Sequence, residues 1–161
     1  MIKGQKDYVT SKQGLILRYN GIFDLKKIYN SSKQWFNDNK YDLTEKEYKE
    51  KPTSVGSEFN LILEAERDID DYAKFFISLQ IFVFDAKKAD GKYNGKIKIN
   101  IPAYVLLDRG DQWQTSSLKS FLFFIYNNLF IKNKIQNVYE DKLYSDLMNL
   151  INNIKKYINV K

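Results

Sequence analysis

Two glutamates and a nearby aspartate form the first group of side chains whose types and spacing suit chemistry. Glu64 and Glu66 lie two residues apart in a segment that alternates apolar and polar residues. On a strand their carboxylates would share one face, about 7 Å apart. Together with Asp70 they suit a hard cation such as Mg²⁺, or the acid and base of a glycoside hydrolase. A solvated strand face followed by an aspartate-rich turn explains the same residues without any chemistry.

A short charged loop is the second candidate. Asp108, Arg109, Asp111 and Trp113 surround Gly110 where an expected strand gives way to an expected helix, which is a usual position for functional loops. An arginine between two aspartates can recognise an anion or form an internal ion pair. The structural alternative is a turn in which Gly110 takes a positive φ, Asp111 caps the helix and Trp113 packs against the sheet.

The third candidate is a lysine-rich segment that we call the basic hairpin. Its members are Lys87, Lys88, Lys92, Tyr93, Lys96 and Lys98. Lysines around an aromatic ring can contact phosphates while the ring stacks on a base. Only three of the 26 Lys and Arg residues are arginine, and the paired hydrogen bonds that read individual bases favour arginine. The pattern therefore indicates contact with an acidic macromolecule without sequence specificity, or a lysine-rich edge that stays soluble.

The composition excludes several classes of chemistry. The 161-residue chain contains no cysteine and no histidine. It therefore has no disulfide, no thiolate metal site and no serine–histidine or cysteine–histidine catalysis. Its seven glycines are scattered and form neither a dinucleotide-binding nor a nucleotide-triphosphate loop. We expect no cofactor.

Charge and hydropathy predict a cytoplasmic protein without a membrane span. The formal charge is +6, and an acidic segment over 41–72 lies between basic segments. The longest apolar run, 121–126, is far shorter than the roughly 20 residues that cross a bilayer. The N-terminal residues lack the apolar region of a signal peptide, and the absence of cysteine fits a reducing compartment.

The first half of the chain predicts strands and one helix. Residues 1–13 are expected to be flexible or to form a weak edge strand. Residues 15–19 form an apolar strand that Asn20–Gly21 should end as a turn. Residues 22–36 carry apolar side chains at spacings of three, which predict an amphipathic helix. Residues 58–66 alternate strictly, which predicts a strand with one buried face.

The following segment predicts two more strands. Residues 72–84 are β-rich and apolar on both faces, so this strand is expected to be central or covered on both sides. Asp90–Gly91 and Asn94–Gly95 should bound a hairpin loop. Residues 96–107 form the next strand, and Pro102 places it at an edge or at a bulge, because proline cannot donate a ladder hydrogen bond.

Two helices are expected at the C-terminal end. The first, over 117–131, follows the N-cap candidates of 115–117, and its apolar residues go most of the way around, which is typical of a largely buried helix. The second, over 134–158, has an apolar stripe that includes Leu143, Leu147 and Leu150. This stripe favours a helix packed on the core over a coiled-coil dimer.

These elements predict a single α+β domain over residues 1–161. Its expected architecture is a two-layer sandwich, in which an antiparallel β-meander packs against one N-terminal and two C-terminal helices. If the sheet curves around the last helix, the fold is helix-grip-like, an arrangement that can hold an apolar ligand. The high aromatic content, 16% of residues, suits either a bulky core or such a cavity.

A set of turns and aromatic residues also carries a family resemblance. The stretches are Tyr19–Leu25, Trp35, Tyr41, Glu45–Lys51, Tyr72–Phe75, Asp108–Trp113, Phe121–Leu122 and Ile125–Tyr126. With these stretches the chain resembles small uncharacterised proteins of nanoarchaeal-type archaea over nearly its whole length. The resemblance implies one compact domain and supplies no activity and no functional residue.

Three functional hypotheses follow from the sequence. The leading one is a non-enzymatic binding domain whose basic surfaces meet an acidic macromolecule: RNA, a ribosomal surface or a protein. The second is a carrier of an apolar ligand in a cavity between sheet and helices. The third is a carboxylate- or Mg²⁺-dependent enzyme that uses Glu64, Glu66 and Asp70.

Overall fold

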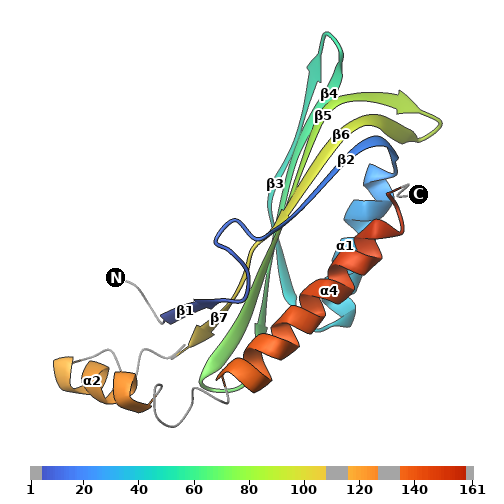
Figure 1. Cartoon of the computed structure of the whole chain (residues 1–161). Coiled ribbons are helices and arrows are strands. Elements are labelled where there is room, and N and C mark those ends of the chain that lie inside the picture. The colour runs from blue at the N-terminus through green and yellow to red at the C-terminus, as the bar shows by residue number, and fades with distance from the viewer. Residues whose placement is uncertain (1–4, 108–115, 127–134, 159–161) are drawn as a thin grey trace.

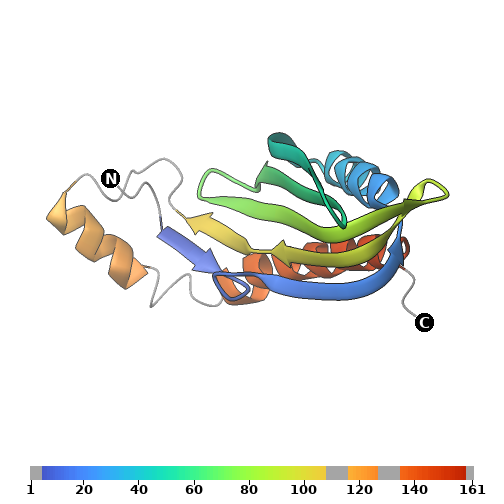
Figure 2. The ribbon, with the colours of Figure 1, turned by 90° about the horizontal axis from the view of Figure 1, so that it is seen from above.

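The computed structural model describes residues 5–107, 116–126 and 135–158 of the chain (Figure 1). In this part, one sheet contains β1 (Gln5–Tyr8), β2 (Leu15–Phe23), β3 (Asp42–Thr53), β4 (Gly56–Asp68), β5 (Ala73–Ala89), β6 (Lys92–Ile101) and β7 (Ala103–Leu107). The helical elements are α1 (Leu25–Asp38), α2 (Ser117–Tyr126), the π-helical η2 (Ile135–Glu140) and α4 (Asp141–Lys155). Helices α1 and α4 cover one face of the sheet (Figure 1, Figure 2), which confirms the predicted α+β two-layer sandwich.

The sheet is antiparallel throughout, and its order explains how α4 is held. The strands follow the order β3-β4-β5-β6-β2, while β7 continues the line of β6 along β5 and β1 pairs with β7. Helix α1 connects β2 at one edge of the sheet to β3 at the other. The strands β3, β4, β5 and β6 then lead back across the sheet, so that β6 pairs with β2. Helix α4 finally runs along the inner face of the curved sheet (Figure 1). The sheet thus curves along the last helix, which is the condition under which the sequence predicts a helix-grip-like arrangement.

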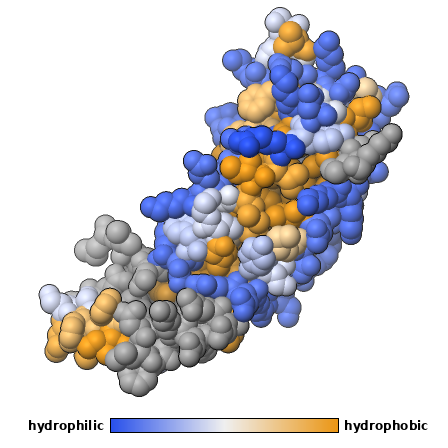
Figure 3. Space-filling model, viewed as in Figure 1, coloured by the Kyte–Doolittle hydropathy of each residue, from blue (hydrophilic) through white to orange (hydrophobic). Residues whose placement is uncertain are grey.

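The core lies between the inner face of the sheet and α4, as the alternation of β4 and β5 predicts. The inner residues of these strands are Phe59, Leu61, Leu63, Ala65, Phe75, Ile77, Leu79, Ile81 and Val83, all buried. Helix α4 contributes Leu143, Leu147, Leu150 and Ile154, each with 0% exposure. The predicted apolar stripe therefore packs on the core, although the segment begins as η2 rather than as one continuous α-helix. Figure 3 shows an apolar area on the molecular surface between hydrophilic surroundings.

Helix α1 begins later than predicted because Asp24 caps it. The Lys27 amide donates to Asp24 Oδ1 at 2.9 Å, and a capping carboxylate also suits the positive end of the helix dipole. Ile28, Ser32 and Phe36 then line the buried side with 0% exposure. Residues before the cap extend β2 instead of the helix.

Two Asn-Gly dipeptides that the sequence presents as turns lie inside strands, so these two turn predictions are wrong. Gly21 of β2 stands directly opposite Gly95 of β6. Gly95 also packs against a bulge in β5, where a Cβ atom would come within 2.7 Å of the Ala86 Cα. Pairing along the whole of β2 therefore overrides the local turn preference. The Asp90–Gly91 turn is confirmed, with φ of 49° and 76°, the left-handed pair that a tight hairpin needs.

Pro102 interrupts a strand but does not lie at a sheet edge. It separates β6 from β7, and both of these pair with β5 on one side and with β2 or β1 on the other. Its carbonyl still accepts a hydrogen bond from the Ser78 amide at 3.0 Å. On the other side, Gly14 packs so closely that a Cβ there would lie 2.1 Å from the Pro102 nitrogen. The missing N–H therefore falls where the ladder is already broken by the connection between β1 and β2.

Helix α2 begins where predicted, but the expectation that it is largely buried is wrong. It lies beyond the end of the sheet (Figure 1), and its apolar surface is visible in Figure 3. Leu118, Phe121 and Phe124 are 68%, 59% and 64% exposed. The apolar content of a helix predicts that it is buried but does not identify the surface that would cover it. The inner face of the sheet is already covered by α1 and α4. The predicted continuation to residue 131 lies outside the described residues.

The described helices are also informative about membranes. Within residues 5–107, 116–126 and 135–158, no helix combines the length and the apolar character that a bilayer crossing requires.

Candidate functional site

Among the described residues, no helix covers one face of the sheet. We call this side, which points away from α1 and α4, the open face (Figure 1, Figure 2). Strand alternation determines which side chains it presents. On β5 the inner residues are buried, whereas Phe76, Gln80 and Phe82 of the open face are half-buried and Phe84 is 42% exposed. This strand therefore carries apolar residues on both sides, as predicted, but the described helices cover only one of them.

A group of cations lies beside the aromatic residues of the open face. Arg18 of β2 stands directly opposite Lys98 of β6, and on the other side Lys98 stands opposite Phe82 of β5. One pleat further along, Lys96 stands opposite Phe84. We call these five residues the cation–aromatic patch. It joins three adjacent strands and places planar rings next to positive charges.

The patch surrounds a shallow depression in the surface. The depression has a volume of about 460 Å³ and is lined by Arg18, Tyr19, Asn20, Phe84, Lys96, Ile97 and Lys98. Positive groups and one exposed aromatic ring therefore lie around a concave surface. Such a surface suits a ligand that carries both negative charge and flat apolar groups.

The positive charge of the patch is only partly neutralised. Lys96 Nζ lies 3.3 Å from Asp85 Oδ2, and both side chains are exposed. Among the described residues, neither Arg18 nor Lys98 has a carboxylate within 4.0 Å. Like charges directly opposite one another on a sheet destabilise it. The Arg18–Lys98 pair therefore lowers the stability of the fold unless an anion binds between its two side chains.

A second aromatic group lies on the same face, near the other end of β5. Tyr104 of β7 stacks on Phe76 with ring centres 4.6 Å apart and contacts Tyr8 of β1 at 5.2 Å. Lys6 Nζ lies 4.6 Å from the centre of the Tyr104 ring. Burial raises the pKa of the Tyr104 hydroxyl above its ordinary value. The open face thus combines lysines with aromatic rings at both ends of β5.

The structure separates the basic hairpin into two groups. Lys96 and Lys98 belong to the patch, whereas Tyr93 points to the opposite face, where its ring packs against Phe59 at 5.1 Å. Lys87 and Lys88 are exposed near the hairpin tip, opposite Asn94 and Tyr93.

Lys92 stands at the same tip, opposite Ala89. Tyr93 therefore does not provide a stacking ring beside Lys96 and Lys98. Phe82 and Phe84 lie in that position, and they and Arg18 are the residues that sequence reasoning missed.

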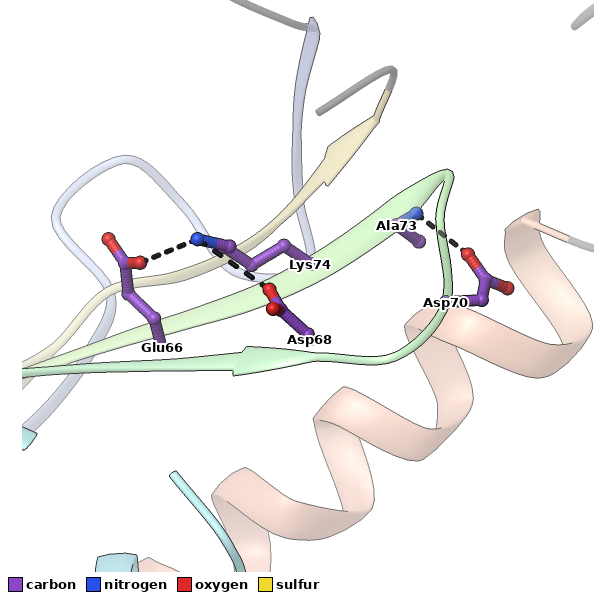
Figure 4. Close-up of polar contacts among 5 residues, drawn as sticks. All are labelled: Glu66, Asp68, Asp70, Ala73 and Lys74. Carbon is purple, nitrogen blue, oxygen red and sulfur yellow. Dashed lines mark hydrogen bonds and ion pairs between the residues drawn. The ribbon is translucent and has the colours of Figure 1, made fainter. Parts of the chain in front are cut away.

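The carboxylates considered for metal binding are held by other groups. Lys74 Nζ lies 2.8 Å from Glu66 and 3.6 Å from Asp68, as Figure 4 shows. Glu64 pairs with Lys46 at 3.4 Å. Glu64 and Glu66 belong to β4 and lie on the open face of the sheet. The structure does not bring them together with the third candidate, Asp70.

Asp70 shapes the turn between β4 and β5. Its Oδ1 accepts a hydrogen bond from the Tyr72 amide at 2.9 Å. It also accepts one from the Ala73 amide at 2.8 Å, which is drawn in Figure 4. Its other carboxylate oxygen accepts a hydrogen bond from the Tyr139 hydroxyl, which links the turn to η2. Within the described parts of the chain, no three His, Cys, Asp or Glu side chains form a group that could hold a metal ion.

Asp108, Arg109, Asp111 and Trp113 lie outside the described residues, so their anion-binding role stays a prediction.

Comparison with protein-family models, curated proteins and solved structures finds no match to this chain. The predicted resemblance to nanoarchaeal proteins therefore stays a prediction.

Proposed function

We propose that this protein binds single-stranded nucleic acid on the open face of its sheet, without catalysing a reaction. The observation that carries the proposal is the pair of Arg18 and Lys98, which stand opposite each other without a carboxylate partner among the described residues, beside the exposed ring of Phe84. A bound phosphate would relieve their mutual repulsion. The adjacent ring would stack on a base.

The chemistry of the patch favours a single strand over a duplex. In a single strand the bases are free to stack on aromatic side chains while the backbone follows a positive surface. In a duplex the bases are already stacked on each other, so Phe82 and Phe84 would gain nothing from them. The mixture of one arginine with two lysines supplies charge more than base-specific hydrogen bonds. We therefore expect binding that tolerates many sequences.

The net charge supports the same proposal at long range. A charge of +6 raises the rate of encounter with a polyanion and makes binding sensitive to salt. The absence of cysteine suits a reducing compartment, so we place this activity in the cytoplasm, where RNA is the abundant single-stranded nucleic acid.

The test compares salt dependence in two double variants. Binding of a fluorescent RNA of about 12 nucleotides, within the usual site sizes, is followed by anisotropy at several salt concentrations. Arg18→Ala with Lys98→Ala should weaken binding about tenfold or more and lower the salt slope by about two units. The matched control, Lys142→Ala with Lys155→Ala, removes the same charge from exposed positions on α4 and should change little.

Other polyanions identify the ligand class. Single-stranded DNA of the same length separates RNA from DNA, and an RNA duplex and polyglutamate should bind more weakly than the single strand. Equal losses in both double variants would mean that only net charge matters and would overturn the proposal. Equal affinity for polyglutamate would assign the site to an acidic protein instead.

A further inference from the structure

A second pocket lies on the opposite side of the sheet from the patch. It has a volume of about 320 Å³ and opens between α1, β3, β4 and β6. Each of these elements contributes one aromatic ring: Tyr29, Tyr48, Phe59 and Tyr93. Because this pocket faces the helix side, it is independent of the proposed nucleic-acid site.

The four rings are arranged as walls rather than as a stack. Tyr29 and Tyr48 meet edge to face, with centres 5.4 Å apart and planes at 77°. Phe59 and Tyr93 meet in the same way, at 5.1 Å and 69°. Phe59 is almost completely buried and forms the floor, whereas Tyr48 is 57% exposed at the entrance. In an edge-to-face pair only one π face of one ring is covered by its partner, so each pair keeps uncovered π faces.

Negative charge lies next to these rings. Glu50 stands opposite Phe59 across β3 and β4, is exposed, and has no ion pair among the described residues. Burial raises the pKa of the Tyr93 hydroxyl, and the Glu50 carboxylate raises it further. Burial and the neighbouring Glu45 carboxylate likewise raise the pKa of Tyr29. Glu45 is paired with Lys33, so it is the Glu50 carboxylate that adds to the negative potential of the ring faces.

The protein already places one cation on this set of rings. Lys33 Nζ lies 5.3 Å from the centre of the Tyr29 ring while it pairs with Glu45. An ammonium group is thus accommodated at the outer edge of the aromatic walls. The pocket itself has an apolar floor that also includes Leu61, which favours a cation that carries methyl groups over a strongly hydrated one.

We propose that this pocket binds an organic cation of the quaternary or methylated ammonium class. The ring faces attract the positive charge, the methyl groups pack on Phe59 and Leu61, and Glu50 supplies the counter-charge at the rim. A metal ion is a poor alternative, because the walls offer rings rather than a set of oxygen ligands. Lys26 is an exposed residue of α1 that also lines the pocket. Its positive charge repels a bound cation, so its removal tests the sign of the ligand's charge.

The experiment uses choline as the probe and measures its binding to the full chain by calorimetry or by NMR titration. Its uncharged carbon isostere, 3,3-dimethylbutan-1-ol, is the matched ligand control. Choline should saturate the site, and the isostere should bind several-fold more weakly. Tyr48→Leu should weaken choline binding about two- to fivefold, the loss of one exposed cation–π contact. Because Tyr48 is largely exposed, this variant should remain folded.

Variants that remove a charge at the pocket rim test the sign of the ligand's charge. Glu50→Gln should weaken choline binding and Lys26→Gln should strengthen it, while Glu58→Gln, a glutamate of the open face, should leave it unchanged. No saturation by choline, or equal binding of the isostere, would overturn the proposal. Weaker choline binding in Lys26→Gln would overturn it as well.

Discussion

Replacement of the exposed ring of the cation–aromatic patch separates stacking from charge. Phe84→Leu keeps an apolar side chain on β5 but removes the π face. Base–aromatic stacking contributes about 1–3 kcal/mol per base, so the affinity for single-stranded RNA should fall about 5- to 150-fold. The salt slope should stay the same, because no phosphate contact is lost.

The effect on stability should be smaller than the effect on binding. Because 42% of Phe84 already faces solvent, even complete truncation to alanine should cost only about 2 kcal/mol, part of the about 3–5 kcal/mol of a buried phenylalanine. The leucine variant retains most of that packing. Circular dichroism during denaturation should therefore show a cooperative transition close to that of the wild type.

The assay is anisotropy of labelled RNA at two salt concentrations, with Phe124→Leu as the matched control. Phe124 is also an exposed phenylalanine, 64% exposed, but it lies on α2. An unchanged affinity of Phe84→Leu would refute the stacking role. An equal loss in Phe124→Leu would show that the apolar surface as a whole, rather than the patch, determines binding.

Three further predictions concern the fold. Leu147→Ala should lower the free energy of unfolding by about 2–5 kcal/mol, because Leu147 is fully buried under the sheet. Urea denaturation measures this loss. A loss below about 1 kcal/mol, which is roughly the cost of a surface change, would contradict this packing. Asp146→Ala should cost about 1–3 kcal/mol, because the Tyr41 hydroxyl donates to Asp146 Oδ2 at 2.8 Å; a Tyr41→Phe background should reduce this cost. Burial and the neighbouring Asp7 carboxylate raise the pKa of Glu140 from 4.5 to about 7. The bound proton thus stabilises the folded state below pH 4.5, and this contribution is lost as the pH rises through about 7; Glu140→Gln should flatten that part of the stability profile, and an unchanged profile would disprove the assignment.

Local alternation was sufficient to predict the central strands β4 and β5 and the core that they line. The strict pattern of residues 58–66 and the inner residues of β5 determine which face is buried, because a one-residue slip would expose every apolar side chain. The turn signals were less reliable. Gly21 and Gly95 pair with each other across β2 and β6, and no local rule distinguishes a glycine in a turn from one that faces a glycine in a distant strand.

The site depended on pairing that the sequence does not specify. Arg18 and Lys98 lie far apart in the chain and meet only because β2 pairs with β6. The alternation did carry one usable signal: Lys96 and Lys98 share a face from which Tyr93 is excluded by its odd spacing. The rings beside the lysines come from β5, and only the sheet order places Phe82 and Phe84 there.

Mapping the RNA contact on the protein tests the central claim most directly. In an NMR titration of the isotope-labelled chain with single-stranded RNA, the largest amide shifts should fall on β2, β5 and β6, around Arg18, Phe84 and Lys98. Added salt should reverse these shifts. Shifts confined to α1 and α4, or no saturable shifts at low salt, would contradict the claim that the open face of the sheet binds nucleic acid.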